Sequence, residues 1–82
     1  MKPRTWLKTL RRKAKLSVPE LAQVLGVTGR SVYRWETGQE YPTRQNAMAL
    51  AVVLGPEVLV RIHQEMVDEY RALTRRTPGG AR

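Results

Sequence analysis

An 82-residue chain without cysteine is long enough for one small domain, and it excludes a fold held together by disulfides or by a thiolate metal site. No apolar run reaches the length of a membrane span and no secretory signal sequence is evident, so we expect a cytoplasmic location and no membrane partner. Lysine and arginine number 15 against 7 aspartates and glutamates, and this net charge of +8 favours an anionic partner, although many domains carry such charge as a solvated face.

A first helix is predicted over residues 4–14. Its apolar residues recur at helical spacing among lysines and arginines: Trp6, Leu7, Leu10 and Ala14. The helix belongs to residues 1–54, which hold 10 basic and 3 acidic side chains, whereas residues 55–82 hold 5 and 4. The anionic partner is therefore expected at the front two-thirds of the chain.

Residues 18–25 are predicted to form a second, short helix. Ser17 and Glu20 match a capping box before it, with Pro19 inside the first turn. Gly26 would end this helix, because glycine adopts the left-handed conformation of a helix end without steric cost.

A third helix is predicted from its capping residue Thr28 to Trp35 or Glu36, with Gly38 as its end. The tight turn that separates the second and third helices, residues 25–28, is typical of a helix-turn-helix. In that motif the third helix presents its amino-terminal end to the major groove of double-stranded DNA, which is wide enough to admit an α-helix. The turn and the basic charge together predict DNA as the anionic partner.

Two further helices are predicted after a loop at residues 39–42. The fourth is strongly apolar, ends at Gly55 and Pro56, and contains Ala47, Met48, Leu50, Ala51 and Leu54. The fifth, from about residue 57 to 73, repeats apolar side chains at three- and four-residue steps: Leu59, Ile62, Met66, Tyr70 and Leu73. Its polar residues are predicted to face water: Glu65, Asp68, Glu69 and Arg71. We predict an all-α fold, a five-helix bundle that contains a helix-turn-helix and has an extended C-terminal helix.

The domain is expected to cover residues 1–74, with a dimerisation helix at about residues 56–74 and a flexible tail at residues 75–82. Leu59 and Ile62 lie close enough to the fourth helix to pack there. Apolar side chains further along would stay wet in a monomer, so we expect a dimer interface formed by Met66, Tyr70 and Leu73.

Residues 7–55 resemble the Cro and phage-repressor family, also called the XRE family of bacterial and phage regulators. The resemblance rests on several elements together: Leu7-x-x-Leu10-Arg11, Leu16-Ser17, Glu20-Leu21-Ala22, Leu25-Gly26-Val27, Trp35-Glu36-x-Gly38, Pro42 and Leu50-Ala51-x-x-Leu54-Gly55. It implies a five-helix fold whose third helix reads DNA. Most members are dimeric repressors or antitoxins that act on inverted repeats, so the resemblance implies a homodimer on double-stranded DNA.

The resemblance also implies roles for single residues. Base reading falls to Gly29, Arg30 and Arg34, with Ser31 and Tyr33 at the edge of the groove. Phosphate contacts fall to Thr28, Thr37, Gln39, Tyr41 and Arg44. Arg11 and Glu36 match family positions that form a structural ion pair.

Two departures from the family narrow the expected base reading. Val18 stands where many relatives carry a glutamine that contacts DNA, and Gly29 has no side chain. Base reading is therefore expected to rest chiefly on Arg30 and Arg34. Arginine favours guanine, because two of its donors match the O6 and N7 acceptors of that base.

Other functions are less well supported by the residues. His63 has no second imidazole or cysteine with which to share a metal, and Glu36 and Glu40 are no convincing catalytic pair, so we predict no metal, no cofactor and no enzyme activity. Two alternatives to a dimeric repressor stay open. One is the antitoxin of a toxin–antitoxin pair, with a toxin as protein partner; the other is an interaction module that has lost DNA binding.

Overall fold

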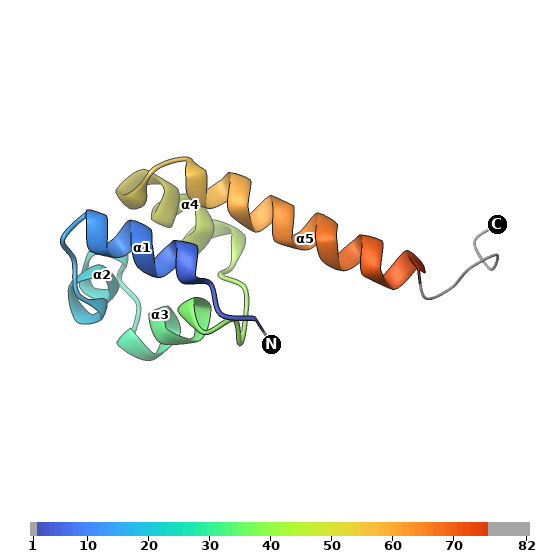
Figure 1. Cartoon of the computed structure of the whole chain (residues 1–82). Helices are drawn as coiled ribbons and strands as arrows, with labels where there is room; N and C mark the ends of the chain where they lie inside the picture. Colours follow the sequence, from blue (N-terminus) through green and yellow to red (C-terminus); the bar gives the residue numbers. More distant parts are fainter. Residues whose placement is uncertain (1, 76–82) are drawn as a thin grey trace.

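The computed structural model describes residues 2–75, and within that range it contains five helices and no strand. The helices are α1 (Thr5–Lys13), α2 (Val18–Leu25), α3 (Gly29–Glu36), α4 (Arg44–Leu54) and α5 (Glu57–Arg75). Figure 1 shows α1 to α4 gathered into one globule, whereas the second half of α5 projects away from it. The predicted all-α fold with a helix-turn-helix is confirmed. Residues 76–82 of the predicted tail lie outside the described residues.

Local caps place the two helices of the helix-turn-helix where the sequence predicts them. The Ser17 hydroxyl accepts from the Glu20 backbone N–H at 3.2 Å, and the Glu20 carboxylate accepts from the Ser17 N–H at 2.8 Å. This second bond lowers the pKa of Glu20, because it favours the charged carboxylate. Gly26 ends α2 with a φ of 72°, and the Thr28 hydroxyl starts α3 by accepting from the Ser31 N–H at 3.2 Å.

The start of α4 depends on a cap that is not predicted from the sequence. The Thr43 hydroxyl accepts from the Asn46 N–H at 3.2 Å, so α4 begins at Arg44, before the apolar stretch. Met48 and Val52 are exposed, and α4 is thus less buried than its composition suggests.

Side chains from all five helices form one core. Those that are almost wholly buried are Leu7, Leu21, Val32, Trp35, Leu50 and Val58. At the start of α5 the core residue is Val58, whereas Leu59 is 36% exposed and is not part of the core. A shift of one residue turns a helix face by about 100°, and the inward face of α5 therefore runs through Val58 and Ile62.

The same rotation corrects the environment of Glu65. This residue lies seven positions after Val58 and three after Ile62, on the face of α5 that turns toward the protein. It is half-buried and bonds to residues at the amino terminus rather than facing water, as the sequence suggests.

The backbone is strained at Lys15, just after the end of α1. Lys15 has a left-handed φ of 61°, while its N–H bonds to the Arg12 carbonyl at 2.9 Å. A side chain in this conformation costs about 1 kcal/mol. Relief of this strain offsets the entropy that glycine adds to the unfolded chain, so we expect Lys15→Gly to leave the free energy of unfolding unchanged or slightly higher, measured by urea denaturation. The matched change Lys8→Gly, in the interior of α1, lacks this relief and should lower the free energy of unfolding by about 1 kcal/mol. A less stable Lys15→Gly variant would contradict the strain.

Candidate nucleic-acid interface

The two faces of α3 carry different kinds of side chain. Val32 and Trp35 are buried in the core, three residues apart on one side of the helix. Arg30, Tyr33 and Arg34 follow the same three- and four-residue spacing on the other side and reach solvent to different extents. The burial of one face thus leaves the other available to a partner.

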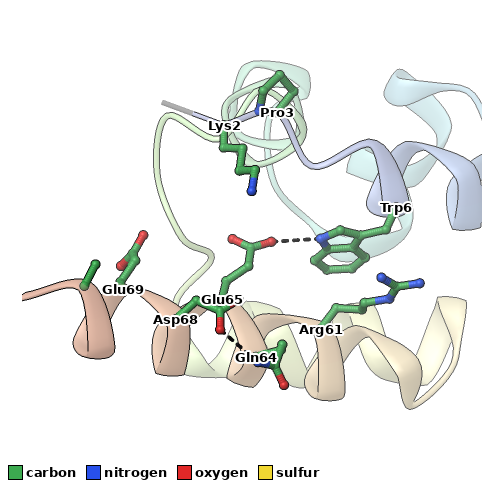
Figure 2. A pocket seen from close by; sticks show the side chains of 9 residues that line it. Lys2, Pro3, Trp6, Arg61, Gln64, Glu65, Asp68 and Glu69 are labelled. Carbon is green, nitrogen blue, oxygen red and sulfur yellow. Dashed lines mark hydrogen bonds between the residues drawn. The ribbon is translucent and has the colours of Figure 1, made fainter. Parts of the chain in front are cut away.

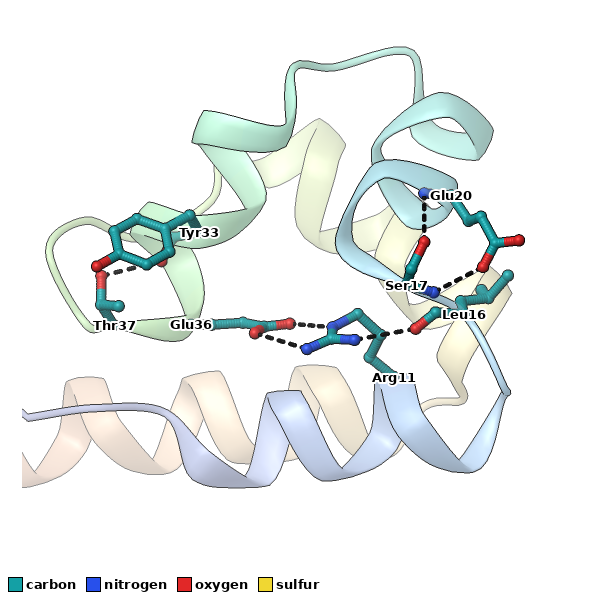
Figure 3. A network of polar contacts seen from close by, with 7 residues as sticks. All are labelled: Arg11, Leu16, Ser17, Glu20, Tyr33, Glu36 and Thr37. Carbon is teal, nitrogen blue, oxygen red and sulfur yellow. Dashed lines mark hydrogen bonds and ion pairs between the residues drawn. The ribbon is translucent and has the colours of Figure 1, made fainter.

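A buried ion pair fixes α3 against α1. The Arg11 guanidinium donates to both carboxylate oxygens of Glu36, from Nε to Oε2 at 2.6 Å and from Nη2 to Oε1 at 3.2 Å, as Figure 3 shows. Nη1 donates to the Leu16 carbonyl at 3.0 Å. Hydrogen bonding to Glu36 raises the pKa of Arg11 more than burial lowers it, so the pair stays charged. The structural pair predicted between Arg11 and Glu36 is confirmed.

The outward face of α3 forms a shallow hollow with the loop that follows it. The hollow is lined by Arg30, Tyr33, Arg34 and Gln39, which we call the α3 face. Arg34 lies 3.5 Å from the carboxylate of Glu40, and both side chains are about half exposed. Three residues predicted to read bases and one predicted to contact phosphate are therefore neighbours.

Hydroxyl groups at both ends of α3 are held in place by the protein. The Thr28 and Ser31 hydroxyls lie 3.2 Å apart at its beginning. At its end the Thr37 hydroxyl donates to the Tyr33 carbonyl at 2.9 Å, as Figure 3 shows, and accepts from the Gln39 amide at 3.0 Å. These bonds join Gln39 to the end of α3 and keep it beside the arginines.

Gly29 and Arg44 do not line the α3 face. A Cβ on Gly29 would point toward Val18 of α2, 3.7 Å from its Cγ1 atom, so this position meets a partner only through its backbone. Arg44 is the first residue of α4, is exposed, and forms no ion pair within residues 2–75. The structure does not bring Arg44 into the hollow.

Tyr41 is placed where a phosphate contact is not available. Its hydroxyl is buried and has no hydrogen-bond partner among residues 2–75, and its ring lies under the Arg4 guanidinium at 4.5 Å. Burial raises the pKa of Tyr41, and the Glu69 and Glu65 carboxylates raise it further. The predicted phosphate role of Tyr41 is therefore wrong, because the loop after α3 turns this residue inward.

Residues 5–60 match the family of helix-turn-helix domains. The chain belongs to this family. The match covers α1 to α4 and the first residues of α5, and it supports DNA binding by the helix-turn-helix as a class. No curated protein and no solved structure matches the chain.

Neither a metal-binding cluster nor a membrane-spanning helix is present among residues 2–75. Residues 2–75 hold no group of three or more histidine, cysteine, aspartate or glutamate side chains that is arranged to bind a metal ion. None of the helices in the same range combines the length and the apolar character that crossing a membrane requires.

The burial of Tyr41 can be tested with a matched pair of variants. We expect Tyr41→Phe to leave DNA affinity within about twofold and not to lower stability, since an unpaired buried hydroxyl contributes nothing favourable. Tyr33→Phe makes the same change on the exposed α3 face. Affinity is measured by fluorescence anisotropy and stability by urea denaturation. A fivefold or larger loss of affinity in Tyr41→Phe, of about 1 kcal/mol, would restore the phosphate role.

Proposed function

We propose that this protein is a sequence-specific transcriptional regulator of the Cro and phage-repressor type, a dimeric repressor that reads an inverted-repeat operator with α3 in the cytoplasm. The observation that carries the proposal is the α3 face, where two arginines and a tyrosine project from a helix whose opposite side is anchored by Arg11 and Glu36. The family match and the net charge of +8 support it. The action is binding rather than catalysis.

In this proposal Arg30 and Arg34 read guanine in the major groove. Arg34 must exchange its contact with Glu40 for a base edge, and an exposed ion pair contributes at most about 1 kcal/mol, so the exchange costs little. Gly29 allows the backbone to approach, and Ser31 and Tyr33 lie at the groove edge. Phosphate contacts, which fix register without reading sequence, fall to Thr28, Thr37, Gln39 and Arg44.

The projecting half of α5 supports a second copy as the partner. Met66, Tyr70 and Leu73 expose 47%, 67% and 63% of their surface along one side of α5. A helix segment this short is marginal in water without packing. Burying these side chains against a second copy removes apolar surface from water and stabilises the segment.

The apolar side chains Leu59, Met66, Tyr70 and Leu73, which we call the α5 stripe, are spaced in a way that favours an antiparallel pair of helices. Leu59 and Leu73 stand seven residues on either side of Met66, so two antiparallel helices that cross at Met66 bring each Leu59 to the Leu73 of the other copy. Figure 1 shows α3 on the side of the globule away from α4, while α5 runs out sideways. A two-fold axis perpendicular to α5 then leaves both α3 helices on one side, as one DNA duplex requires.

An antitoxin is the second candidate. It would use the same DNA chemistry, and the exposed apolar side chains of α4, Met48 and Val52, offer a separate surface for a toxin. An interaction module without DNA binding is disfavoured by the α3 face, where Arg30 is exposed and the side chain of Arg34 is about half exposed.

Base reading and phosphate contact predict different phenotypes. We expect Arg30→Ala and Arg34→Ala each to relax preference at particular base pairs, at a cost of about 1–3 kcal/mol for the preferred base. Arg44→Ala should weaken binding to all sequences alike and reduce the slope of log affinity against log salt by about 1. Selection from random duplexes, followed by titration of single-base variants, measures both. An Arg30→Ala variant that keeps every base preference would show that α3 does not read DNA as proposed.

The dimer interface is tested by placing charge on the stripe. We expect Met66→Asp combined with Tyr70→Asp to give a folded monomer in sedimentation equilibrium and to lose about 10²–10⁴ in affinity for a two-half-site duplex. Val60→Asp introduces the same charge at an exposed valine on another side of α5 and should stay dimeric. A dimeric double variant with wild-type affinity would exclude α5 as the interface.

A further inference from the structure

Arg4 is a buried charge that the proposed DNA contacts do not use. Only 3% of its surface is exposed. Its backbone N–H donates to the Glu36 carbonyl at 2.7 Å, and its Nη1 atom donates to the Trp35 carbonyl at 2.6 Å and to the Glu40 carbonyl at 2.9 Å. These carbonyls lie at the carboxyl end of α3 and in its loop, where the helix dipole favours a cation. Arg4 thus holds the end of the recognition helix.

The other edge of the Arg4 guanidinium reaches α5. Its Nε atom donates to Oε1 of Glu65 at 3.0 Å, and Oε2 of Glu65 accepts from the Trp6 indole N–H at 2.8 Å. Figure 2 shows Glu65 rising from α5 to the Trp6 indole, beside a hollow of about 420 Å³. Both oxygens of Glu65 are therefore engaged by the amino-terminal segment.

The path of that segment is fixed by Gly38. This residue has a φ of 79°, and a Cβ on it would overlap the backbone carbonyl of Lys2. Glycine lets residues 2–4 cross the end of α3 in backbone contact. Figure 1 shows the start of the chain beside that end.

We propose that Arg4 and Glu65 are positioning residues that fix the recognition helix relative to α5 and thereby set the separation of the two DNA half-sites. Within residues 2–75 no hydrogen bond or ion pair joins α3 to α5 directly, and Arg4 bonds to both. The inference rests on the proposed function: when α5 pairs with a second copy, the angle between α3 and α5 determines how far apart the two α3 helices lie. Half-sites about 34–36 Å apart require that angle to be defined.

The test compares two glutamates on α5. Glu65→Gln keeps the shape and the acceptor for Trp6 but removes the charge that pairs with Arg4. Glu57→Gln is the matched control, because Glu57 pairs with Arg61 at 3.1 Å on the exposed side of the same helix. Duplexes carry two identical half-sites with spacers of different length. We expect the wild type and Glu57→Gln to prefer one spacing by about tenfold, and Glu65→Gln to prefer it by less than about threefold with single half-site affinity unchanged.

A second readout measures the geometry without DNA. The chain contains no cysteine, so Arg30→Cys and Arg71→Cys place one spin label on α3 and one on α5, diluted with unlabelled protein. Double electron–electron resonance should give a narrow distribution of distances between the two labels in the otherwise unchanged protein and in Glu57→Gln. The distribution should be broader or shifted in Glu65→Gln. An unchanged distribution, or an unchanged spacing preference, in Glu65→Gln overturns the positioning role. If the wild type binds no DNA, the proposed function is overturned, and so is the role in half-site spacing. The distances between the spin labels still report whether Arg4 and Glu65 join α3 to α5.

Discussion

Two buried arginines hold the carboxyl end of α3, and the placement of this helix depends on them. An α-helix of eight residues has little stability of its own, so packing and end contacts must fix it. Arg11 binds the Glu36 side chain, while Arg4 binds the carbonyls of Trp35, Glu36 and Glu40. Both sides of the same helix end are thereby tied down, one to α1 and the other to α5. The opposite end needs only the local Thr28 cap, which leaves it accessible.

Burial divides the charges of the chain into two groups with different energetics. Removing one partner of a buried pair such as Arg11 and Glu36 costs about 3–5 kcal/mol, a large share of the roughly 5–15 kcal/mol that keeps a domain folded. The exposed pair of Arg34 and Glu40 contributes little and separates easily. Fixed charges therefore define the orientation of α3, and loosely held charges on its outer face remain free to exchange partners.

Elements determined by local sequence could be predicted, whereas distant contacts could not, except the pair of Arg11 and Glu36, which the family resemblance implied. The bounds of α2 and α3 follow from Ser17, Gly26 and Thr28, each acting within four residues. The contact between Arg4 and Glu65 joins positions 61 residues apart, and no local pattern marks Arg4. A signal for Glu65 was present, because Val58, Ile62 and Glu65 share one helix face, but it becomes readable only once Val58 is known to be buried. Tyr41 was misassigned for the same reason: its burial depends on Arg4 and α5.

If the protein reads DNA and pairs as proposed, the connection through Arg4 makes these two functions dependent on each other. If contacts to Glu65 restrict the orientation of α3, any partner that favours one orientation of α3 also favours the arrangement of the amino-terminal segment that bonds to α5. Coupling of this kind is reciprocal, so if pairing through α5 strengthens the binding of DNA at α3, bound DNA strengthens the pairing by the same free energy. Under this proposal, a second copy that orders the projecting half of α5 also restricts α3 through Glu65 and Arg4. A second copy bound to the α5 stripe would thus add a second α3 helix and also restrict the orientation of the first.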